Sequence, residues 1–320
     1  MAGDLRRMKI AAIDIGTNTL LLLVAEIDDG GRLTVLAEEQ ETPRLGRNVD
    51  ATGRLDSAVF PVAASVLDRY LRAASSLGVD RVTAVATSAL RNAANSDEFI
   101  SKVKIATGLG IRVIGGDEES ELTYLGAASG LDPGDGEPVV LDIGGGSTEI
   151  CYRYPGRVNG GRGLKRYSFG IGSVGITERY FRDIPPTAAQ IRTARTHVIE
   201  ELSDVVNTGF PGYTPVGVAG TATTLAGLLL GLDTYDREAI DGLRLSREKL
   251  SAITSRLLGS TPAEIRAMSG LTAGREDILA AGALILSTVA EHFGFLSVRV
   301  STRGLRYGMV IREWESSKEM

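Results

Sequence analysis

The chain of 320 residues is poor in the two side chains that most often carry metal sites and covalent catalysis, with one cysteine and two histidines. A single cysteine, Cys151, excludes an intramolecular disulfide and indicates a reducing compartment. Cys151 follows an apolar stretch, which favours a buried side chain over a nucleophile. His197 and His292 both lie within helical patterns, so neither a histidine-based metal site nor a Ser-His-Asp triad is expected.

Long hydrophobic runs are also missing. Leu20–Ala25 is apolar but short, which argues against a signal peptide or a membrane span. We therefore expect a cytoplasmic protein with no membrane partner. The formal net charge of −5 argues against nucleic-acid binding, which usually needs a basic domain. A polyanionic substrate is still allowed, because local arginines can line a groove on an acidic protein.

Two common nucleotide-binding signatures are absent or misleading. No Walker-type G-x-x-x-x-G-K-[S/T] turn occurs. Phe169–Gly175 (FGIGSVG) matches G-x-G-x-x-G, but no acidic residue lies between Ile184 and Ile199, where a ribose-binding acid belongs in a dinucleotide fold. Phosphate contact by this glycine loop remains an open expectation.

The most informative stretch is Val139–Ile150, VVLDIGGGSTEI. An apolar strand ends at Asp142, and glycines without a Cβ then allow backbone N–H groups to close on an anion. Asp142 and Glu149 would repel that anion unless a divalent cation lay between them, and Mg²⁺ is the best candidate. Taken alone, a tight glycine hairpin with incidental acids accounts for the stretch equally well. The candidate phosphate-binding residues here are Gly144, Gly145, Gly146, Ser147 and Thr148.

The same pattern occurs a second time, in Ile10–Thr19 (IAAIDIGTNT), where an apolar strand ends at Asp14. A third glycine turn in Val216–Gly227 follows an apolar strand and leads into an apolar helix. The distance between the two D-I-G turns is far too long for a solenoid repeat and indicates two copies of one α/β domain facing a shared cleft. These turns add as phosphate-binding candidates Gly16, Thr17, Asn18, Thr19, Gly220 and Thr221.

Two D-I-G turns followed by a G-T turn resemble the superfamily of acetate and sugar kinases, heat-shock chaperones and actin. Within it, the chain is most similar to the exopolyphosphatase and guanosine pentaphosphate phosphohydrolase family, Ppx/GppA, over nearly its whole length. The two turns alone indicate only the superfamily, and the specific signal is their combination with the other segments. The segments are DIGTNT, ATSALR at Ala86–Arg91, GGDEESELTYLG at Gly115–Gly126, LDIGGGSTE at Leu141–Glu149 and STRGLRYG at Ser301–Gly308.

The resemblance implies an α/β fold of two duplicated actin-like (ribonuclease H-like) domains with a cleft between them. We place the first domain at residues 1–124 and the second at 125–304, and we expect a helix at about 305–320 to pack back on the first. Longer members of the family carry a further C-terminal helical domain, so this chain is expected to be a short form. A homodimer is also expected.

Three further residues gain a role only from the resemblance. Ser88 and Arg91 form a strand-end hydroxyl followed by an arginine, which suits an oxyanion; on residues alone, a helix cap and a surface arginine are an equal alternative. Glu119 lies among acids that could simply complement a helix N-terminus. Aligning GGDEESELTY with the family pattern S-G-x-E-E-A-x-L-x-Y gives Glu119 the role of catalytic glutamate, with Gly115 and Ser120 as small departures.

The expected chemistry is phosphoryl transfer to water. Asp14, Asp142 and Glu149 are the candidate ligands of Mg²⁺, with Mn²⁺ as the alternative ion. Glu119 would activate the water, and Arg91 would stabilise the phosphoryl group. The expected activity is that of an exopolyphosphatase on inorganic polyphosphate, with guanosine pentaphosphate as a further candidate substrate. The alternatives are a kinase of the same superfamily and a non-catalytic polyphosphate or nucleotide sensor.

Overall fold

The computed structural model describes residues 7–132, 134–158, 161–205, 210–268 and 274–318. The chain forms two compact units, of which unit 1 comprises Met1–Gly126 and Leu305–Met320, and unit 2 comprises Ala127–Gly304. The boundary expected after residue 124 falls inside helix α5 (Gly116–Ala128), the helix in which the chain leaves unit 1. The chain re-enters unit 1 at the start of helix α13 (Leu305–Lys318).

Unit 1 is built on a five-stranded sheet with the order β3-β2-β1-β4-β5. Strands β1, β2 and β3 form an antiparallel meander, whereas β4 and β5 run parallel to β1. The strands are β1 (Met8–Ile15), β2 (Leu20–Ile27), β3 (Leu33–Glu41), β4 (Arg81–Ala86) and β5 (Arg112–Val113).

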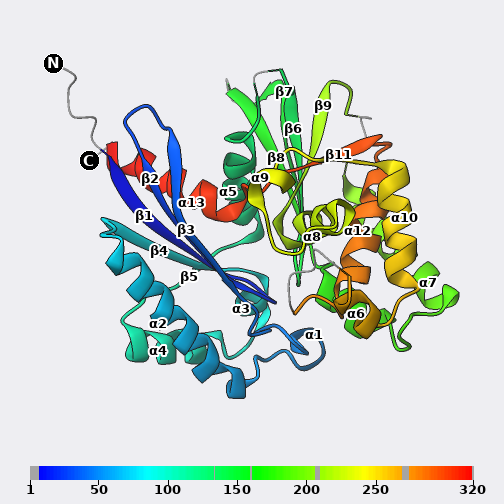
Figure 1. Ribbon diagram of the computed structural model, residues 1–320, viewed down its shortest axis with the longest axis horizontal. Coiled ribbons are helices and arrows are strands. Elements are labelled where there is room, and N and C mark those ends of the chain that lie inside the picture. Colours follow the sequence, from blue (N-terminus) through cyan, green and yellow to red (C-terminus); the bar gives the residue numbers. More distant parts are fainter. Residues whose placement is uncertain (1–6, 133, 159–160, 206–209, 269–273, 319–320) are drawn as a thin grey trace. The chain divides into compact units, whose positions relative to one another are not determined.

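Helices cover both faces of this sheet, as Figure 1 shows. Side chains alternate between the faces of a strand, so Ala11 and Ile13 of β1 pack in one buried cluster with α2 and α4, while Ile10 and Ala12 pack in another with α13. The run Ile10–Ile13 of the first strand is therefore apolar because it is covered on both sides. The unit 1 helices not yet given are α1 (Val49–Thr52), α2 (Phe60–Ser76), α3 (Ser88–Asn92), α4 (Ser96–Thr107) and the short 3-10 helix η1 (Ser57–Val59).

Unit 2 is built on a six-stranded sheet with the order β10-β11-β9-β6-β7-β8. Again the first three strands form an antiparallel meander, β6-β7-β8, and the next two, β9 and β11, run parallel to the first. The strands are β6 (Glu137–Ile143), β7 (Thr148–Val158), β8 (Gly161–Phe169), β9 (Tyr213–Val218), β10 (Arg244–Ser246) and β11 (Ser297–Val300).

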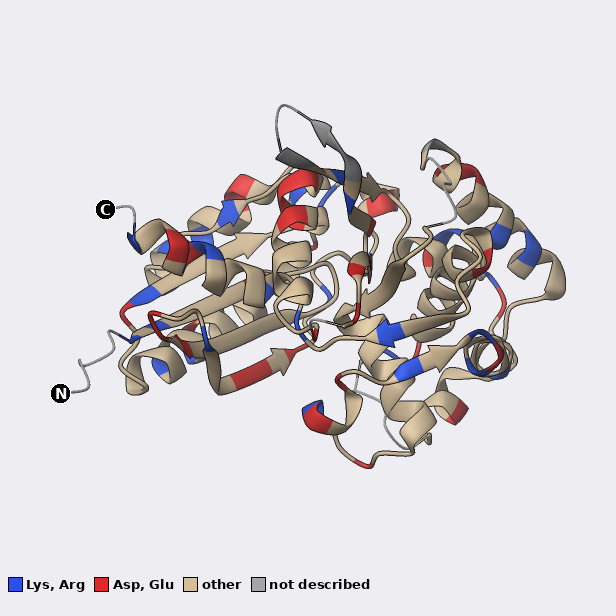
Figure 2. Cartoon of the chain, turned by 90° about the horizontal axis from the view of Figure 1, so that it is seen from above, with Lys and Arg blue, Asp and Glu red and all other residues tan. Residues whose placement is uncertain are grey.

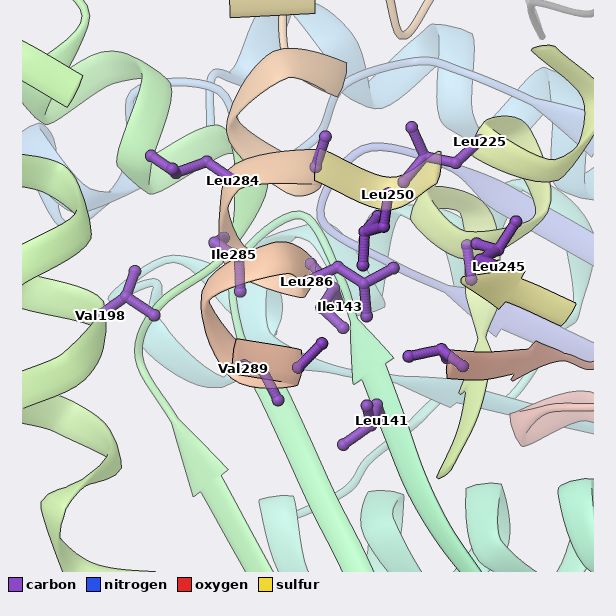
Figure 3. Packing of buried hydrophobic residues seen from close by; sticks show 14 of the residues in the cluster. Leu141, Ile143, Val198, Leu225, Leu245, Leu250, Leu284, Ile285, Leu286 and Val289 are labelled. Atoms are coloured by element: carbon purple, nitrogen blue, oxygen red, sulfur yellow. The ribbon is translucent and has the colours of Figure 1, made fainter. Parts of the chain in front are cut away.

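The core of unit 2 forms where the sheet meets helix α12 (Leu279–His292). Figure 3 shows Leu141 and Ile143 of β6 beside Leu286 and Val289 of α12. Helix α12 is apolar on all sides because other helices cover the faces that the sheet leaves open. The remaining elements are α6 (Ser173–Tyr180), α7 (Ala188–Glu201), η2 (Leu202–Asp204), α8 (Ala219–Leu230), α9 (Arg237–Ile240), α10 (Arg247–Leu258) and α11 (Pro262–Arg266).

The two sheets share one topology. Strands β1 to β5 of unit 1 match β6, β7, β8, β9 and β11 of unit 2 in order and in direction, and β10 is an added antiparallel edge strand. This is the internal duplication that the repeated D-I-G turn predicts. Asp14 in β1 and Asp142 in β6 therefore occupy equivalent places, each next to the last residue of the first strand of its sheet.

The surface carries charges of both signs, interspersed along the described elements of both units (Figure 2). Among the described residues, no helix combines the length and the apolar character needed to cross a membrane. Cys151 is buried in β7, as expected.

Candidate active site

The first half-site is the turn between β1 and β2 in unit 1. The turn closes through a 3.0 Å hydrogen bond from the Gly16 N–H to the Thr19 carbonyl. A neighbouring loop supports it, because the N–H groups of Arg44 and Gly46 donate to the carbonyls of Asn18 and Thr17 over 3.0 and 2.7 Å. Both carbonyls are thus occupied, which holds the turn in one conformation.

Asp14 precedes this turn at the end of β1, and its side chain is largely shielded from water. Its Oδ1 atom is buried and has no hydrogen-bond partner among the residues that the structure describes. Burial raises the pKa of Asp14 to about 7, the negative charge of Glu119 adds to the rise, and Arg306 opposes it. A carboxylate in this situation is poised to take up either a proton or a cation.

Glu119 and Arg91 form an ion pair in the same unit. The Nη1 atom of Arg91 donates to Glu119 Oε2 over 3.0 Å and also to the Ile114 carbonyl over 2.9 Å. Burial raises the pKa of the Glu119 carboxyl, while Arg91 pulls it down by charge and by hydrogen bonding. Ser88 is buried at the start of α3, where its hydroxyl accepts a 3.4 Å hydrogen bond from Asn92. Asp14, Ser88, Arg91 and Glu119 therefore belong to unit 1, as do the candidates of the first turn, Gly16, Thr17, Asn18 and Thr19.

The second half-site is the equivalent turn between β6 and β7 in unit 2. The Gly144 N–H donates to the Ser147 carbonyl over 2.9 Å, reproducing the closure at Gly16. Asp142 and Glu149 are direct partners across the antiparallel ladder and therefore project on the same face of the sheet. In unit 1 the partner of Asp14 is Leu21, so the second carboxylate is particular to unit 2.

The candidate threonines of unit 2 are hydrogen-bonded within the protein. The hydroxyl of Thr148 donates to the Ile171 carbonyl over 2.6 Å, and that of Thr221 donates to the Ile143 carbonyl over 2.9 Å. A hydroxyl has one proton to donate. In this structure these two hydroxyls therefore hold the turns in place, and phosphate binding by Thr148 and Thr221 stays a prediction.

The glycine loop at Gly170–Gly175 supports the triple-glycine turn. The N–H groups of Ser173 and Val174, at the start of α6, donate to the carbonyls of Gly144 and Gly145 over 2.9 and 2.8 Å. These two donors therefore hold the triple-glycine turn, and phosphate contact by the rest of the loop stays a prediction. Gly172 has no room for a side chain, because a Cβ there would lie 2.5 Å from the Gly146 carbonyl carbon.

The comparisons with known proteins agree with this duplicated architecture. The model of the Ppx/GppA phosphatase family matches residues 23–317. The chain belongs to the Ppx/GppA phosphatase family. It is a hydrolase, and the predicted fold of two duplicated actin-like domains is confirmed.

The relatives of this Ppx/GppA chain include an exopolyphosphatase and a guanosine-5'-triphosphate,3'-diphosphate pyrophosphatase. It is 34% identical to exopolyphosphatase 2 of Mycobacterium tuberculosis, over 95% of this chain and 98% of the relative. It is 30% identical to a guanosine-5'-triphosphate,3'-diphosphate pyrophosphatase of Photobacterium profundum, over 94% of this chain but 58% of that longer protein. The crystal structure of the Ppx/GppA family member of Aquifex aeolicus has a TM-score of 0.80 and 32% identity, covering 98% of this chain and 99% of that one.

Ppx/GppA phosphatases generally depend on a divalent metal, and the carboxylates of this chain fit one. The unpartnered Oδ1 of Asp14 and the paired carboxylates of Asp142 and Glu149 are the oxygen ligands that Mg²⁺ prefers. Within the described ranges, no three His, Cys, Asp or Glu side chains gather into a complete metal-binding group. An ion held by one or two of these carboxylates would complete its coordination with water and phosphate oxygens, as Mg²⁺ commonly does.

Sequence reasoning missed two side chains of unit 2 that adjoin these carboxylates. Ser168 of β8 donates a 2.9 Å hydrogen bond to Glu149 Oε1. The guanidinium of Arg275 is mostly buried, and desolvation lowers its pKa to about 10 although the charge of Asp142 opposes that change. It lies against Gly220, where any side chain would overlap it, and the preceding Ala219 has a left-handed φ of 59°. The glycine of the third turn thus makes room for a buried cation.

Proposed function

We propose that the protein removes terminal phosphates from inorganic polyphosphate by hydrolysis of the phosphoanhydride bond, with guanosine pentaphosphate as a further candidate substrate. The proposal rests on family membership and on the names of relatives from both branches. Both substrate classes are polyanions whose terminal phosphate is joined to the next by a phosphoanhydride bond. Two phosphate-binding turns suit such a group.

The observation that carries the mechanism is the environment of Glu119. Its carboxylate is buried, stands close enough to Asp14 to raise that residue's pKa, and is held at 3.0 Å by Arg91. A general base works best when its pKa lies nearer the working pH than that of an ordinary carboxylate, and burial moves Glu119 in that direction. In the proposal, Glu119 takes a proton from the attacking water.

The turns provide the phosphate contacts in this proposal. The N–H groups of Gly16 and Gly144 close the two turns, and the remaining backbone N–H groups at Gly16–Thr19 and at Gly144–Thr148 approach the phosphate oxygens, because glycine leaves no Cβ in the way. Arg91 and Arg275 add positive charge that becomes more valuable as negative charge shifts within the transferring group. In unit 2 the negative charge of Asp142 raises the pKa of Arg275, so this guanidinium keeps its positive charge beside a proposed metal ligand.

Asp14, Asp142 and Glu149 would hold the divalent ion, and we propose Mg²⁺ with Mn²⁺ as the alternative. When bound, the ion offsets negative charge on the phosphates. The protein's own contribution is to shield these carboxylates from water, and Ser168 orients Glu149 for the ion.

The test is phosphate release measured in parallel from short polyphosphate, long polyphosphate, guanosine pentaphosphate and ATP, each with Mg²⁺. We expect release from polyphosphate, and the Glu119→Gln protein provides the blank for contaminating phosphatases. Phosphate transfer to an added alcohol or carboxylate in place of water would make the protein a kinase. Tight polyphosphate binding without release, equal in wild type and Glu119→Gln, would make it a sensor. Either result would overturn the proposal.

A further inference from the structure

Helix α13 touches the backbone of helix α5 at one glycine of unit 1. A Cβ built on Gly308 would lie 2.6 Å from the carbonyl carbon of Leu122 and closer still to its oxygen. The obstacle is backbone within a helix, which cannot turn aside as the end of a flexible side chain can. Only glycine therefore allows the two helices to approach this closely, and close approach is the usual role of small residues at helix crossings.

Other contacts hold the two helices together on either side of Gly308. Arg312 of α13 pairs with Glu121 of α5 at 2.7 Å. Leu122 and Leu305 are both buried in the cluster that packs against β1. The contact at Gly308 is thus part of the core of unit 1, and α13 braces α5 against the central sheet.

Glu119 lies on α5 about one turn before Leu122, in the first turn of the helix. The Glu119 N–H donates to the Gly115 carbonyl over 3.0 Å, so the position of its side chain follows the backbone of α5. The carboxylate of Glu119 has to stay near both Arg91 and Asp14, which are held by other elements. Any displacement of α5 at Leu122 would move Glu119 relative to both.

We propose that Gly308 is a positioning residue for Glu119, because it lets α13 fix α5 at the depth in unit 1 where Glu119 meets Arg91 and Asp14. This inference rests on the proposed role of Glu119 as the base. A misplacement of about 1 Å can cost on the order of a hundredfold in rate even when it arises away from the reacting atoms. Substrate binding by the glycine turns would be little affected, because neither turn contains α5.

The experiment is Gly308→Ala, assayed for phosphate release from polyphosphate with Mg²⁺. We expect kcat to fall by about tenfold or more with KM changed by less than about threefold. Val310→Ala is the matched control: Val310 is buried on the same helix, and shortening it costs stability without adding bulk against α5. Gly110→Ala, at an exposed glycine with open space around it, controls for the alanine itself. Both controls should keep kcat.

A purely structural role is distinguished by combining Gly308→Ala with Glu119→Gln. If Gly308 acts through Glu119, the double variant is no slower than Glu119→Gln alone. The inference would be overturned if the two substitutions lowered kcat independently, so that the double variant lost the product of the two factors. A Gly308→Ala protein with normal kcat would also overturn it. Normal turnover in Glu119→Gln would instead overturn the proposed base, whatever Gly308→Ala does.

If Gly308→Ala does not fold, Arg312→Gln replaces it, because it loosens the same contact without adding bulk. A loss of kcat of about threefold that disappears in the Glu119→Gln background would support the inference. An unchanged kcat would overturn it.

Discussion

Arg91 joins Glu119 to the end of strand β5, since one nitrogen of its guanidinium donates both to the carboxylate at 3.0 Å and to the Ile114 carbonyl at 2.9 Å. Arg91 lies on α3 and Glu119 on α5, so the pair ties together two segments that follow different strands. It also keeps the charge of a buried carboxylate compensated. The predictions that follow begin with the two members of this pair.

Glu119→Gln keeps the size of the side chain and removes the base. The rate of phosphate release should fall by roughly 10²–10⁴-fold, with polyphosphate binding retained, because the turns that hold phosphate are unchanged. Steady-state release and calorimetric titration with polyphosphate of defined length measure the two effects. Near-normal turnover would contradict the assignment. The next candidates for the base would then be Glu118 and Glu121, which form more exposed ion pairs with Arg112 and Arg312.

Arg91→Met removes the charge that holds the pKa of Glu119 down. Burial then acts unopposed, so the pKa of Glu119 rises further and less of the base is ionised at a given pH. The limb of kcat/KM that rises with pH should move to higher pH, and the maximal rate should also fall. A pH–rate profile of both proteins checks this. An unmoved limb would mean that Arg91 does not tune the group that titrates in the profile.

Asp14 should make the metal-free protein less stable as the pH rises. Its folded-state pKa is raised from 3.8 to about 7, so the stabilisation is complete below about pH 4 and is lost as the pH approaches 7. Asp14→Asn should flatten this decline and raise the thermal midpoint at pH 8 in the presence of chelator. Thermal unfolding from pH 4 to 8 measures both curves. Parallel curves would show that Asp14 is not the group responsible.

The sequence predicted the frame of the fold well and the site in part. Apolar runs ending in Asp14 and Asp142 located the first strand of each sheet, because strand order and turn chemistry both leave local signals. The burial of Arg275 has no such signal, since a charged residue before an apolar helix resembles a solvated helix start. The hydrogen-bond partners of Thr148 and Thr221 could not be predicted from the sequence either, because the carbonyls of Ile171 and Ile143 come close to them only in the folded protein.

The divalent ion should be required for activity, because the carboxylates at Asp14, Asp142 and Glu149 would otherwise repel the substrate. Excess chelator should abolish phosphate release, and titration with Mg²⁺ or Mn²⁺ should restore it. Asp142→Asn should raise the ion concentration needed for half-maximal rate while leaving the thermal midpoint in chelator nearly unchanged. Full turnover in excess chelator would refute the metal assignment.

Gly172→Ala tests whether the loop before α6 shapes the triple-glycine turn. The added Cβ would lie 2.5 Å from the Gly146 carbonyl carbon and closer to the Gly145 oxygen, so the turn must shift. The N–H groups of the triple-glycine turn would then no longer point toward a bound phosphate. KM for polyphosphate should therefore rise by about tenfold or more, with some loss of stability.

Gly170→Ala is the matched control, because Gly170 lies in the same loop with no atom within 4 Å of the added Cβ. It should leave both KM and the thermal midpoint unchanged. If Gly172→Ala lowers stability but binds polyphosphate normally, the β6–β7 turn is a folding element and not the phosphate cradle. The binding role would then fall to the equivalent turn at Gly16, which closes through the same type of hydrogen bond.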